Sequence, residues 1–382
     1  MPVDLQKVPQ KDQTYEMCLE AVRQDGLALE FVEEQTPEIC MAAVRQDGWA
    51  LEYVKHQTPE ICLAAVQENG LTLEFVEEQI PEICMAAVRQ DGWALEYVKE
   101  QTPGICLAAV RQDGMALYHV KNQTPEICLE AVRQDGWALK YACNPSPEVC
   151  LTAVRQNGYA LKFVREQTPE LCLEAVKQKG AALELVEEQT PEICLAAVRQ
   201  NSHALLYVKD QTPEICLEAV RQNVWAYAYV KKQTPEICLA MVSRYGDMLK
   251  VVKYQTREVC LTAVRQNGLA LCHVKEPTPE ICLEAVRQNE GAIKYVPAGM
   301  RSQEICMTAV RKDGLALRYV PKKDQTLPMA IAALKQNPEC RQYLAARFRI
   351  PEVYKAAGCD YKPEDLAKLR SGIVQARNIN RE

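Results

Sequence analysis

TPEICMAAVRQDGWALEYVKHQ, residues 36–57, is followed at once by a near copy, residues 58–79, and copies continue along most of the 382-residue chain. Thirteen cysteines follow one another at intervals of 22 residues, from Cys18 to Cys282, and Cys306 follows after 24. Self-similarity at a short fixed period indicates an array in which each repeat is one supersecondary unit stacked on the next.

The first half of each repeat carries the signals of a short helix. Thr58 can accept a hydrogen bond as the N-cap, Pro59 suits the first helical position, and Glu60 is favourable in the first turn. The apolar residues that follow are spaced to form one stripe. In the preceding repeat, the stretch Arg-Gln-Asp-Gly at 45–48 supplies helix stop signals, namely a basic residue in the last turn and a glycine just beyond it.

A second short helix is expected after the glycine, with Ala50, Leu51 and Val54 on one side. Helices of roughly ten and eight residues are marginal alone, since isolated helices below about 12–15 residues are unstable in water. Their stability must therefore come from stacking. The sequence predicts an all-α fold, an α-solenoid of about 14–15 tandem 22-residue helix-turn-helix repeats.

The repeats are expected to span residues 13–340, after an N-terminal extension of residues 1–12. A fifteenth, degenerate copy has Ala330 at the cysteine position. Residues 341–382 depart from the pattern and contain the helix-breaking Pro351 and Pro363. We predict that they form a helical C-terminal cap, because the last unit of a stack must present a polar outer face.

A different structure is compatible with the same period. Units of 22 residues punctuated by proline are typical of lipid-binding apolipoprotein helices, in which one continuous amphipathic helix lies on a lipid surface. Glycine in the middle of the repeats, as at Gly48, Gly70 and Gly92, argues against this structure because glycine costs about 1 kcal/mol inside a helix. Lipid-surface binding stays as an alternative.

The pattern E-I-C-L-x-A-V-R-Q-N/D-G-x-A-L-x-Y-V resembles the tandem repeats of domain-of-unknown-function family 4116, with the best matches at 131–139, 153–161 and 263–271. The resemblance implies a helical repeat protein without an established activity, of a kind found in bacteria that live inside eukaryotic cells and in protists. It implies no functional residues. It adds the expectation of a bacterial protein that acts in a host cell.

Charge is unevenly distributed along the chain. Residues 1–188 hold 16 Lys and Arg against 31 Asp and Glu, a net charge of −15, whereas residues 189–382 hold 29 against 20, a net charge of +9. Such a division suggests two different partner surfaces, or self-association through the oppositely charged halves. Drift of exposed residues among duplicated repeats explains it equally well.

The cysteines of the 22-residue register are expected to be buried, free thiols that pack as small hydrophobic residues. Equivalent positions in neighbouring repeats should lie about 8–10 Å apart, too far for a disulfide, which needs Cα atoms within about 7 Å. No CxxC motif occurs. This usage predicts a reducing compartment, the cytosol or a host cytosol. Greater accessibility is expected for the cysteines outside the register, which are Cys143, Cys272, Cys340 and Cys359.

The position just after the glycine varies most between repeats, from glycine to tryptophan, and holds all four tryptophans of the chain. A framework position would not tolerate this range, so the column is predicted to face solvent or a partner, unless its side chains pack between adjacent repeats. An aromatic recognition surface for a protein partner would use rings from this column and from the second helix. Its candidate residues are Trp49, Trp93, Trp137, Tyr159, Trp225, Tyr53, Tyr97, Tyr207 and Tyr229.

A basic residue follows most register cysteines after five positions. If this column acts as a phosphate ladder, it binds the backbone of a nucleic acid. Such binding would depend on the column residues in the basic half of the chain. The favoured interpretation is local: basic charge complements the end of the first helix and forms ion pairs with the acidic column of Glu38, Glu60 and Glu82. The candidate ladder is Arg199, Arg221, Arg265 and Arg287.

Other classes of function have little support in the sequence. The sequence contains no apolar run of about 18 residues, so a membrane span is not expected. The N-terminus is polar and has no apolar segment of the kind found in a secretory signal. The four histidines belong to no catalytic or metal-binding motif, and no phosphate-binding loop occurs. We therefore expect no enzymatic activity, no cofactor and no metal, but a cytoplasmic protein-binding scaffold, with nucleic-acid binding as the main alternative.

Overall fold

The computed structural model describes residues 5–361, and within them the chain is all-α, with no β-strand in this range. Each repeat consists of an α-helix followed by a 3-10 helix (η), which confirms the predicted α-solenoid class. The chain divides into two compact parts, Met1–Asp210 and Gln211–Glu382.

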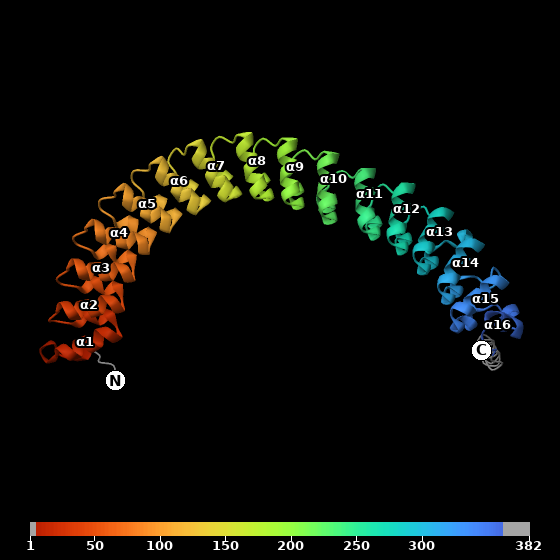
Figure 1. The fold of residues 1–382 in the computed structure, drawn as a ribbon, viewed down its shortest axis with the longest axis horizontal. Coiled ribbons are helices and arrows are strands. Elements are labelled where there is room, and N and C mark those ends of the chain that lie inside the picture. The colour runs from red at the N-terminus through yellow and green to blue at the C-terminus, as the bar shows by residue number, and fades with distance from the viewer. Residues whose placement is uncertain (1–4, 362–382) are drawn as a thin grey trace, which may run out of the picture. The chain divides into compact units, whose positions relative to one another are not determined.

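In the N-terminal part the α-helices follow one another in a row from α1 to α9 (Figure 1). They are α1 (Tyr15–Gln24), α2 (Pro37–Gln46), α3 (Pro59–Glu68), α4 (Pro81–Gln90), α5 (Pro103–Gln112), α6 (Pro125–Gln134), α7 (Pro147–Gln156), α8 (Pro169–Gln178) and α9 (Pro191–Gln200). The 3-10 helices between them are η3 (Gly26–Phe31), η4 (Gly48–Tyr53), η5 (Gly70–Phe75), η6 (Gly92–Tyr97), η7 (Gly114–His119), η8 (Gly136–Tyr141), η9 (Gly158–Phe163), η10 (Gly180–Leu185) and η11 (Ser202–Tyr207).

The C-terminal part has the same construction. Its α-helices are α10 (Pro213–Gln222), α11 (Pro235–Arg244), α12 (Arg257–Gln266), α13 (Pro279–Gln288), α14 (Gln303–Lys312), α15 (Leu327–Gln336) and α16 (Pro351–Ala357). Its 3-10 helices are η12 (Val224–Tyr229), η13 (Gly246–Val251), η14 (Gly268–His273), η15 (Glu290–Tyr295), η16 (Ala298–Met300), η17 (Gly314–Tyr319), η18 (Pro338–Tyr343) and η19 (Ala346–Phe348).

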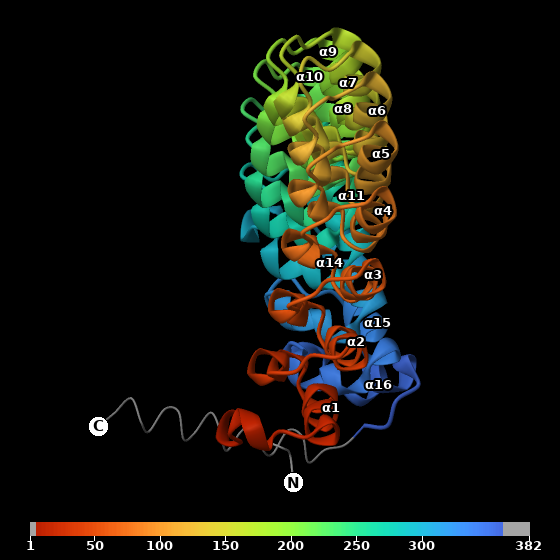
Figure 2. The same ribbon diagram turned by 90° about the vertical axis from the view of Figure 1, so that its left-hand side faces the viewer.

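Within the N-terminal part, neighbouring α-helices pack on one another and neighbouring 3-10 helices do the same. Each 3-10 helix also contacts the α-helix of its own repeat and, except for the last, that of the next repeat. The two kinds of helix therefore form two rows, which the turned view separates (Figure 2). The continuous helix of the lipid-surface alternative does not form among residues 5–361, because every repeat breaks after its α-helix.

The first helix of the repeat matches the prediction, whereas the second differs from it. The α-helix of the second repeat, α2, has 10 residues, and the hydroxyl of Thr36 accepts a hydrogen bond from the backbone N–H of Ile39. The second helix, η4, is a 3-10 helix of 6 residues, not an α-helical segment of about eight. Six residues complete two 3-10 turns of three residues but fewer than two α-helical turns of about 3.6.

The glycine that begins most of the 3-10 helices has a different role from the predicted helix stop. Asp47 ends α2 in an extended conformation, and Gly48 is the first residue of η4. Gly358 is the one glycine with positive φ in the described chain. The requirement at Gly48 is steric, since a Cβ atom there would lie 2.7 Å from the carbonyl oxygen of Ala65 in the next α-helix.

The same core positions recur at the 22-residue period of the sequence. Ile39, Cys40 and Val44 of α2 and Leu51 of η4 are buried, and the same positions are buried in nearly every repeat. All cysteines are free, and every cysteine of the register is buried, as predicted.

The cysteines outside the register follow the prediction in part. Cys143 and Cys272 are exposed and Cys359 is half-buried. The prediction of an accessible Cys340 is wrong, since its exposure is 0%. Cys340 lies in η18 at the position that Ala50 holds in η4, which faces the core in both repeats.

A glutamine ties most loops to the next repeat, a feature that was not among the predictions from the sequence. Gln79 Nε2 donates to the carbonyl of Tyr97 at 2.9 Å, and Gln79 Oε1 accepts from the backbone N–H of Lys99 at 3.0 Å. We call this residue, which directly precedes the N-cap, the loop glutamine. The equivalent side-chain bond to a carbonyl 18 residues further on is made by Gln13, Gln35, Gln57, Gln101, Gln123, Gln167, Gln189, Gln211, Gln233, Gln255 and Gln325.

The ends of the array differ from its repeats. The N-terminal extension contains two single-turn helices, η1 (Leu5–Lys7) and η2 (Gln10–Asp12). At the other end, α16 packs on α15 and ends at Gly358, which has a φ of 69°. The prediction that Pro351 breaks a helix is wrong, since Pro351 is the first residue of α16, where a missing N–H removes no helical hydrogen bond. The rest of the predicted cap, from residue 362 with Pro363, lies outside the described residues. Along residues 5–361 no helix is long and apolar enough to cross a membrane.

Candidate functional site

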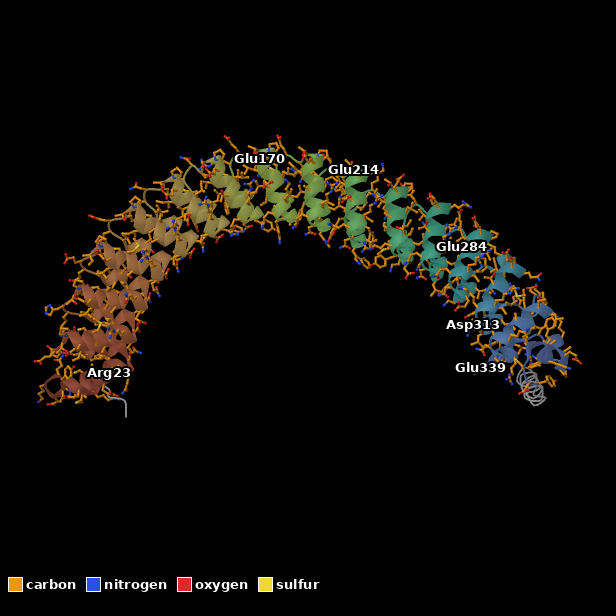
Figure 3. The ribbon with its side chains drawn as sticks, viewed as in Figure 1. Arg23, Glu170, Glu214, Glu284, Asp313 and Glu339 are labelled. Atoms are coloured by element: carbon orange, nitrogen blue, oxygen red, sulfur yellow. The ribbon has the colours of Figure 1, made fainter. Side chains whose placement is uncertain are left out.

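The repeats present two kinds of edge. At the turn edge an α-helix ends and its 3-10 helix begins, as at residues 46–48, whereas at the loop edge a 3-10 helix ends and the next α-helix begins, as at residues 54–58. In the N-terminal part, Arg23 lies towards the turn edge at the end of α1, and Glu170 lies at the opposite edge where α8 begins (Figure 3).

Three tryptophans stand at the turn edge, each as the second residue of a 3-10 helix. The backbone N–H of Trp49 donates to Asp47 Oδ1 at 2.9 Å, and Trp93 and Trp137 are held in the same way by the preceding aspartates. This cap fixes where the 3-10 helix begins and so where the indole projects. The exposed fractions of Trp49, Trp93 and Trp137 are 36%, 37% and 39%, although the residues on either side of each are buried.

The covered side of each tryptophan packs on a ring of the following repeat. That ring stands at the position of Tyr53 in its own repeat, so the structure brings two predicted columns together across the repeat boundary. The tryptophan column therefore combines the two roles that the sequence left open, packing on one side and exposure on the other. The edge-on ring pairs are Trp49–Phe75 at 5.7 Å, Trp93–His119 at 5.2 Å and Trp137–Phe163 at 5.4 Å between centroids.

Tyr118 extends one of these pairs into a larger cluster. Its ring lies edge-on to those of His119 at 4.9 Å and Tyr141 at 5.0 Å, and Lys140 Nζ lies 5.1 Å from the Tyr141 centroid. The exposed fraction of Tyr118 is 61%. Together with Trp93, the three rings form a continuous series of ring contacts over three repeats, in which Tyr118 is the most exposed member.

Tyr118 was not among the residues predicted from the sequence. The signal that could have identified it is an aromatic residue at a position that holds glutamate in the earlier repeats, as at Glu74 and Glu96. We call the whole set of rings the aromatic strip, and it consists of Trp49, Phe75, Trp93, Tyr118, His119, Trp137, Tyr141 and Phe163.

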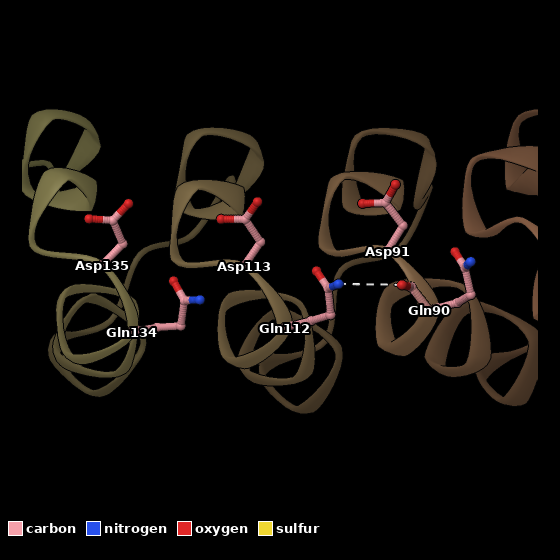
Figure 4. Close-up of a pocket in the computed structure, with 6 residues that line it drawn as sticks. All are labelled: Gln90, Asp91, Gln112, Asp113, Gln134 and Asp135. Atoms are coloured by element: carbon pink, nitrogen blue, oxygen red, sulfur yellow. Dashed lines mark hydrogen bonds between the residues drawn. The ribbon is translucent and has the colours of Figure 1, made fainter.

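Carboxylates border the aromatic strip at the turn edge. Asp91, Asp113 and Asp135 line a polar hollow of about 440 Å³ on three consecutive repeats, together with a glutamine from each of the same turns (Figure 4). The indole Nε1 of Trp93 donates to Asp113 Oδ2 at 2.9 Å. Rings next to carboxylates suit a ligand that carries both apolar and cationic groups.

Side-chain amides hold these turns in register. Gln112 Nε2 donates to the carbonyl of Gln90 at 3.3 Å (Figure 4), and its Oε1 accepts from the backbone N–H of Gly92 at 2.7 Å. The spacing of the carboxylates along the hollow is therefore fixed by the stacking itself.

The predicted tyrosines of the 3-10 helices are half-buried. The pKa of Tyr53 is raised, first by the neighbouring carboxylate of Glu52. The pKa of Tyr97 is raised by burial, and the carboxylates of Glu74 and Glu96 act in the same direction. Glutamates therefore lie close to both of these tyrosines, neither of which belongs to the aromatic strip.

The other predicted aromatic residues are not part of the aromatic strip. Tyr159 and Tyr207 are half-buried on η9 and η11, and Tyr229 is half-buried on η12. Trp225, in the C-terminal part, is 58% exposed and lines a separate hollow of about 450 Å³ with Tyr245.

The basic column forms ion pairs between repeats. Arg111 Nε lies 3.0 Å from Glu130 Oε1, and Arg155 Nε lies 2.9 Å from Glu174 Oε2. These glutamates come two residues after a register cysteine, so the expected partner column of Glu38, Glu60 and Glu82 was wrong for these pairs. The pairing supports the local interpretation of the basic column.

Two members of the candidate phosphate ladder are paired as well. Arg265 lies 3.7 Å from Glu284, and Arg287 lies 3.3 Å from Glu304, which does belong to the first-turn acidic column. Arg199 and Arg221 occupy the same exposed position on α9 and α10. In the described part of the chain, no group of three or more His, Cys, Asp or Glu side chains is placed to hold a metal ion.

Comparison with protein families agrees with the repeat geometry. The model of the family described as Domain of unknown function (DUF4116) matches residues 14–57, 58–101, 103–145, 190–234 and 278–325, together more than half of the chain. The chain belongs to the DUF4116 family. Each DUF4116 match spans two of the 22-residue repeats. No curated protein and no solved structure matches the chain significantly.

Proposed function

We propose that this DUF4116 protein is a non-enzymatic scaffold that binds an extended polypeptide segment, basic and partly apolar, along the aromatic strip. The observation that carries the proposal is the continuous set of rings from Trp93 to Tyr141, exposed at Tyr118 and bordered by the carboxylate of Asp113.

Each component of the aromatic strip has a role in such binding. Tryptophan and tyrosine rings, together with arginine, provide most of the affinity in protein interfaces. Ring faces and carboxylates both attract lysine and arginine side chains. The net charge of −15 over residues 1–188 would accelerate the approach of a basic segment.

The proposal includes action in a reducing compartment. Free, buried thiols recur in every repeat from Cys18 to Cys306, and such chains are typical of the cytosol, where thiols stay reduced. The bacterial origin expected from the family resemblance extends this to the cytosol of a host cell.

The experiment is a selection of random peptides displayed on phage against the full chain. The variant Trp49→Leu, Trp93→Leu, Trp137→Leu keeps an apolar side chain on the next repeat, and leucine already occupies this column at Leu27 and Leu71. We expect the wild-type chain to enrich peptides in which Lys or Arg alternates with apolar residues. The triple variant should bind them at least about tenfold more weakly, a difference of about 1.4 kcal/mol.

A matched control changes exposed loop-edge residues in three repeats that carry rings of the aromatic strip: His56→Gln, Glu100→Gln and Asn122→Gln. This variant should retain full affinity for the selected peptides. Equal binding of these peptides by the tryptophan variant, or loss of binding in the loop-edge control, would refute the aromatic strip as the site.

A further inference from the structure

One junction between repeats departs from the pattern at the loop edge. The chain from Ala142 to Pro147 reads ACNPSP, so Pro145 stands where other repeats have the loop glutamine. Asn144 has a φ of 52° and is the one non-glycine residue with positive φ among residues 5–361. Asparagine tolerates this conformation. The backbone therefore completes the junction without the glutamine side chain.

The next junction shows what is missing. Gln167 Nε2 donates to the carbonyl of Leu185 at 2.9 Å, and Gln167 Oε1 accepts from the backbone N–H of Glu187 at 3.1 Å. The same Oε1 lies 3.6 Å from the thiol of Cys172. One primary carboxamide thus satisfies an acceptor, a donor and a thiol.

At the Pro145 junction the three corresponding groups remain in place without a partner in the described chain. They are the carbonyl of Phe163, the backbone N–H of Arg165 and the thiol of Cys150. The backbone keeps the direction that it has beside Gln167, because Val164 (φ −79°, ψ 123°) closely matches Val186 (φ −76°, ψ 119°).

A hollow occupies the place of the absent side chain. It measures about 360 Å³ and is lined mainly by apolar surface, including Pro145, Cys150, Val164 and Leu171. The exposed fractions of Cys150, Val164 and Leu171 are 7%, 9% and 7%. The equivalent residues around Gln167 are less exposed, at 3%, 1% and 3% for Cys172, Val186 and Ile193.

The other exceptions to the loop glutamine lack this combination. Pro277 also holds the glutamine position, but the residue 20 positions further on is Pro297, which has no N–H to satisfy. Arg301 fills the position itself and donates to the carbonyl 18 residues ahead at 2.6 Å. A hollow of about 410 Å³ also lies at Gln13, where the carboxamide of the chain is already in place.

We propose that the hollow at Pro145 binds a primary carboxamide from outside the chain. The oxygen of the ligand accepts from the N–H of Arg165 and from the thiol of Cys150, and its NH₂ group donates to the carbonyl of Phe163. Its alkyl part contacts Pro145 and Val164. A glutamine side chain of a peptide and a small free amide both carry this chemistry. The site lies at the loop edge and is independent of the aromatic strip.

The test follows the backbone amide of Arg165 by NMR in full-length protein labelled with ¹⁵N-arginine, with its signal assigned through Arg165→Lys. The probes are N-acetyl-Ala-Gln-Ala-N-methylamide, its Glu analogue and acetamide. We expect a saturable shift with the Gln peptide and at least about tenfold weaker binding of the Glu peptide, whose carboxylate cannot donate to Phe163. Tighter binding of the Gln peptide than of acetamide would indicate a polypeptide ligand, and equal binding a small amide.

Three variants complete the test. Pro145→Gln supplies the carboxamide from the chain itself, so it should abolish the shift and raise the Tm. Pro145→Ala leaves the hollow empty and should retain binding, as should Pro277→Gln. The proposal fails if Pro145→Gln still binds the Gln peptide, if the Gln and Glu peptides bind alike, or if the Arg165 signal does not move at the highest soluble probe concentration.

Discussion

Glycine at the start of a 3-10 helix sets how closely successive repeats approach. A Cβ atom on Gly92 would lie 2.7 Å from the carbonyl oxygen of Ala109, which is backbone and cannot move aside on its own. Gly104, in the first turn of α5, has nothing within 4 Å of such an atom. The two glycines therefore respond differently to the same substitution.

We predict that Gly92→Ala lowers the free energy of unfolding by about 1–3 kcal/mol, as overpacking does elsewhere. Gly104→Ala should instead raise it by about 0.4–1 kcal/mol, because alanine loses less conformational entropy in a helix. Urea denaturation followed by circular dichroism measures both. Equal effects of the two substitutions would show that the close approach has no energetic weight.

Burial also determines the reactivity of the thiols. It raises the pKa of Cys62 to about 11, so at pH 8 only about one molecule in 1,000 carries the thiolate there. Cys143 and Cys272 are exposed. We predict that iodoacetamide labels Cys143 and Cys272 rapidly in the native protein and Cys62 very slowly, as read by peptide mass spectrometry. After unfolding the three rates should converge, and rapid labelling of native Cys62 would contradict the buried register.

At the scale of the element, ion pairs join one α-helix to the next. Glu174 accepts from Arg155 Nε at 2.9 Å and from Lys177 Nζ at 3.2 Å, and these bonds, with Arg155 first, lower the pKa of its carboxyl group. A carboxyl group with a lowered folded-state pKa stabilises the fold above its unfolded pKa of about 4.3. That contribution is lost as the pH falls through the folded value.

Glu174→Gln should therefore lower the free energy of unfolding at pH 7 by about 0.2–1 kcal/mol, the range of exposed ion pairs. The difference between variant and wild type should shrink as the pH falls below about 4. Urea denaturation at pH 7 and pH 3 measures it. In an Arg155→Gln background the same substitution should cost less, and an undiminished cost would assign the effect to something other than this pair.

The first helix of the repeat was predictable because its signals are local. Thr36 caps α2, and Pro37 opens it. The type of the second helix was not predictable. A segment of only six residues, such as Gly48–Tyr53, is too short for its apolar spacing to distinguish an α-helix from a 3-10 helix. The loop glutamine was visible as a column, but its partners lie 18 and 20 residues away, as at Tyr97 and Lys99 beyond Gln79, and only stacking brings them together.

The candidate site was also predictable only in part, from the positions that vary between repeats. Variation between repeats located Trp49, Trp93 and Trp137 on an accessible edge. Tyr118 occurs at a charged position in a single repeat, so no periodic signal pointed to it. Its role depends on rings in its own and the following repeat.

At the scale of the whole molecule, stability in an array is a sum of repeats and of contacts between neighbours. Charge is the property that differs along the chain, with a net −15 over residues 1–188 and +9 over residues 189–382. We predict self-association at low salt that disappears at about 1 M salt, where the Debye length is about 3 Å. Sedimentation velocity at the two salt concentrations measures it. A monomer at both would show that the opposite charges do not bring chains together.

The most direct test of the aromatic strip is tryptophan emission, because all four tryptophans lie in one column. In a Trp225→Leu background the signal comes from Trp49, Trp93 and Trp137 alone. Titration with the selected basic peptides should shift the emission saturably to shorter wavelength and reduce quenching by Cs⁺, which the carboxylates near Trp93 attract in the free protein. Emission and quenching that stay unchanged while the peptides bind would place their site elsewhere and contradict the account.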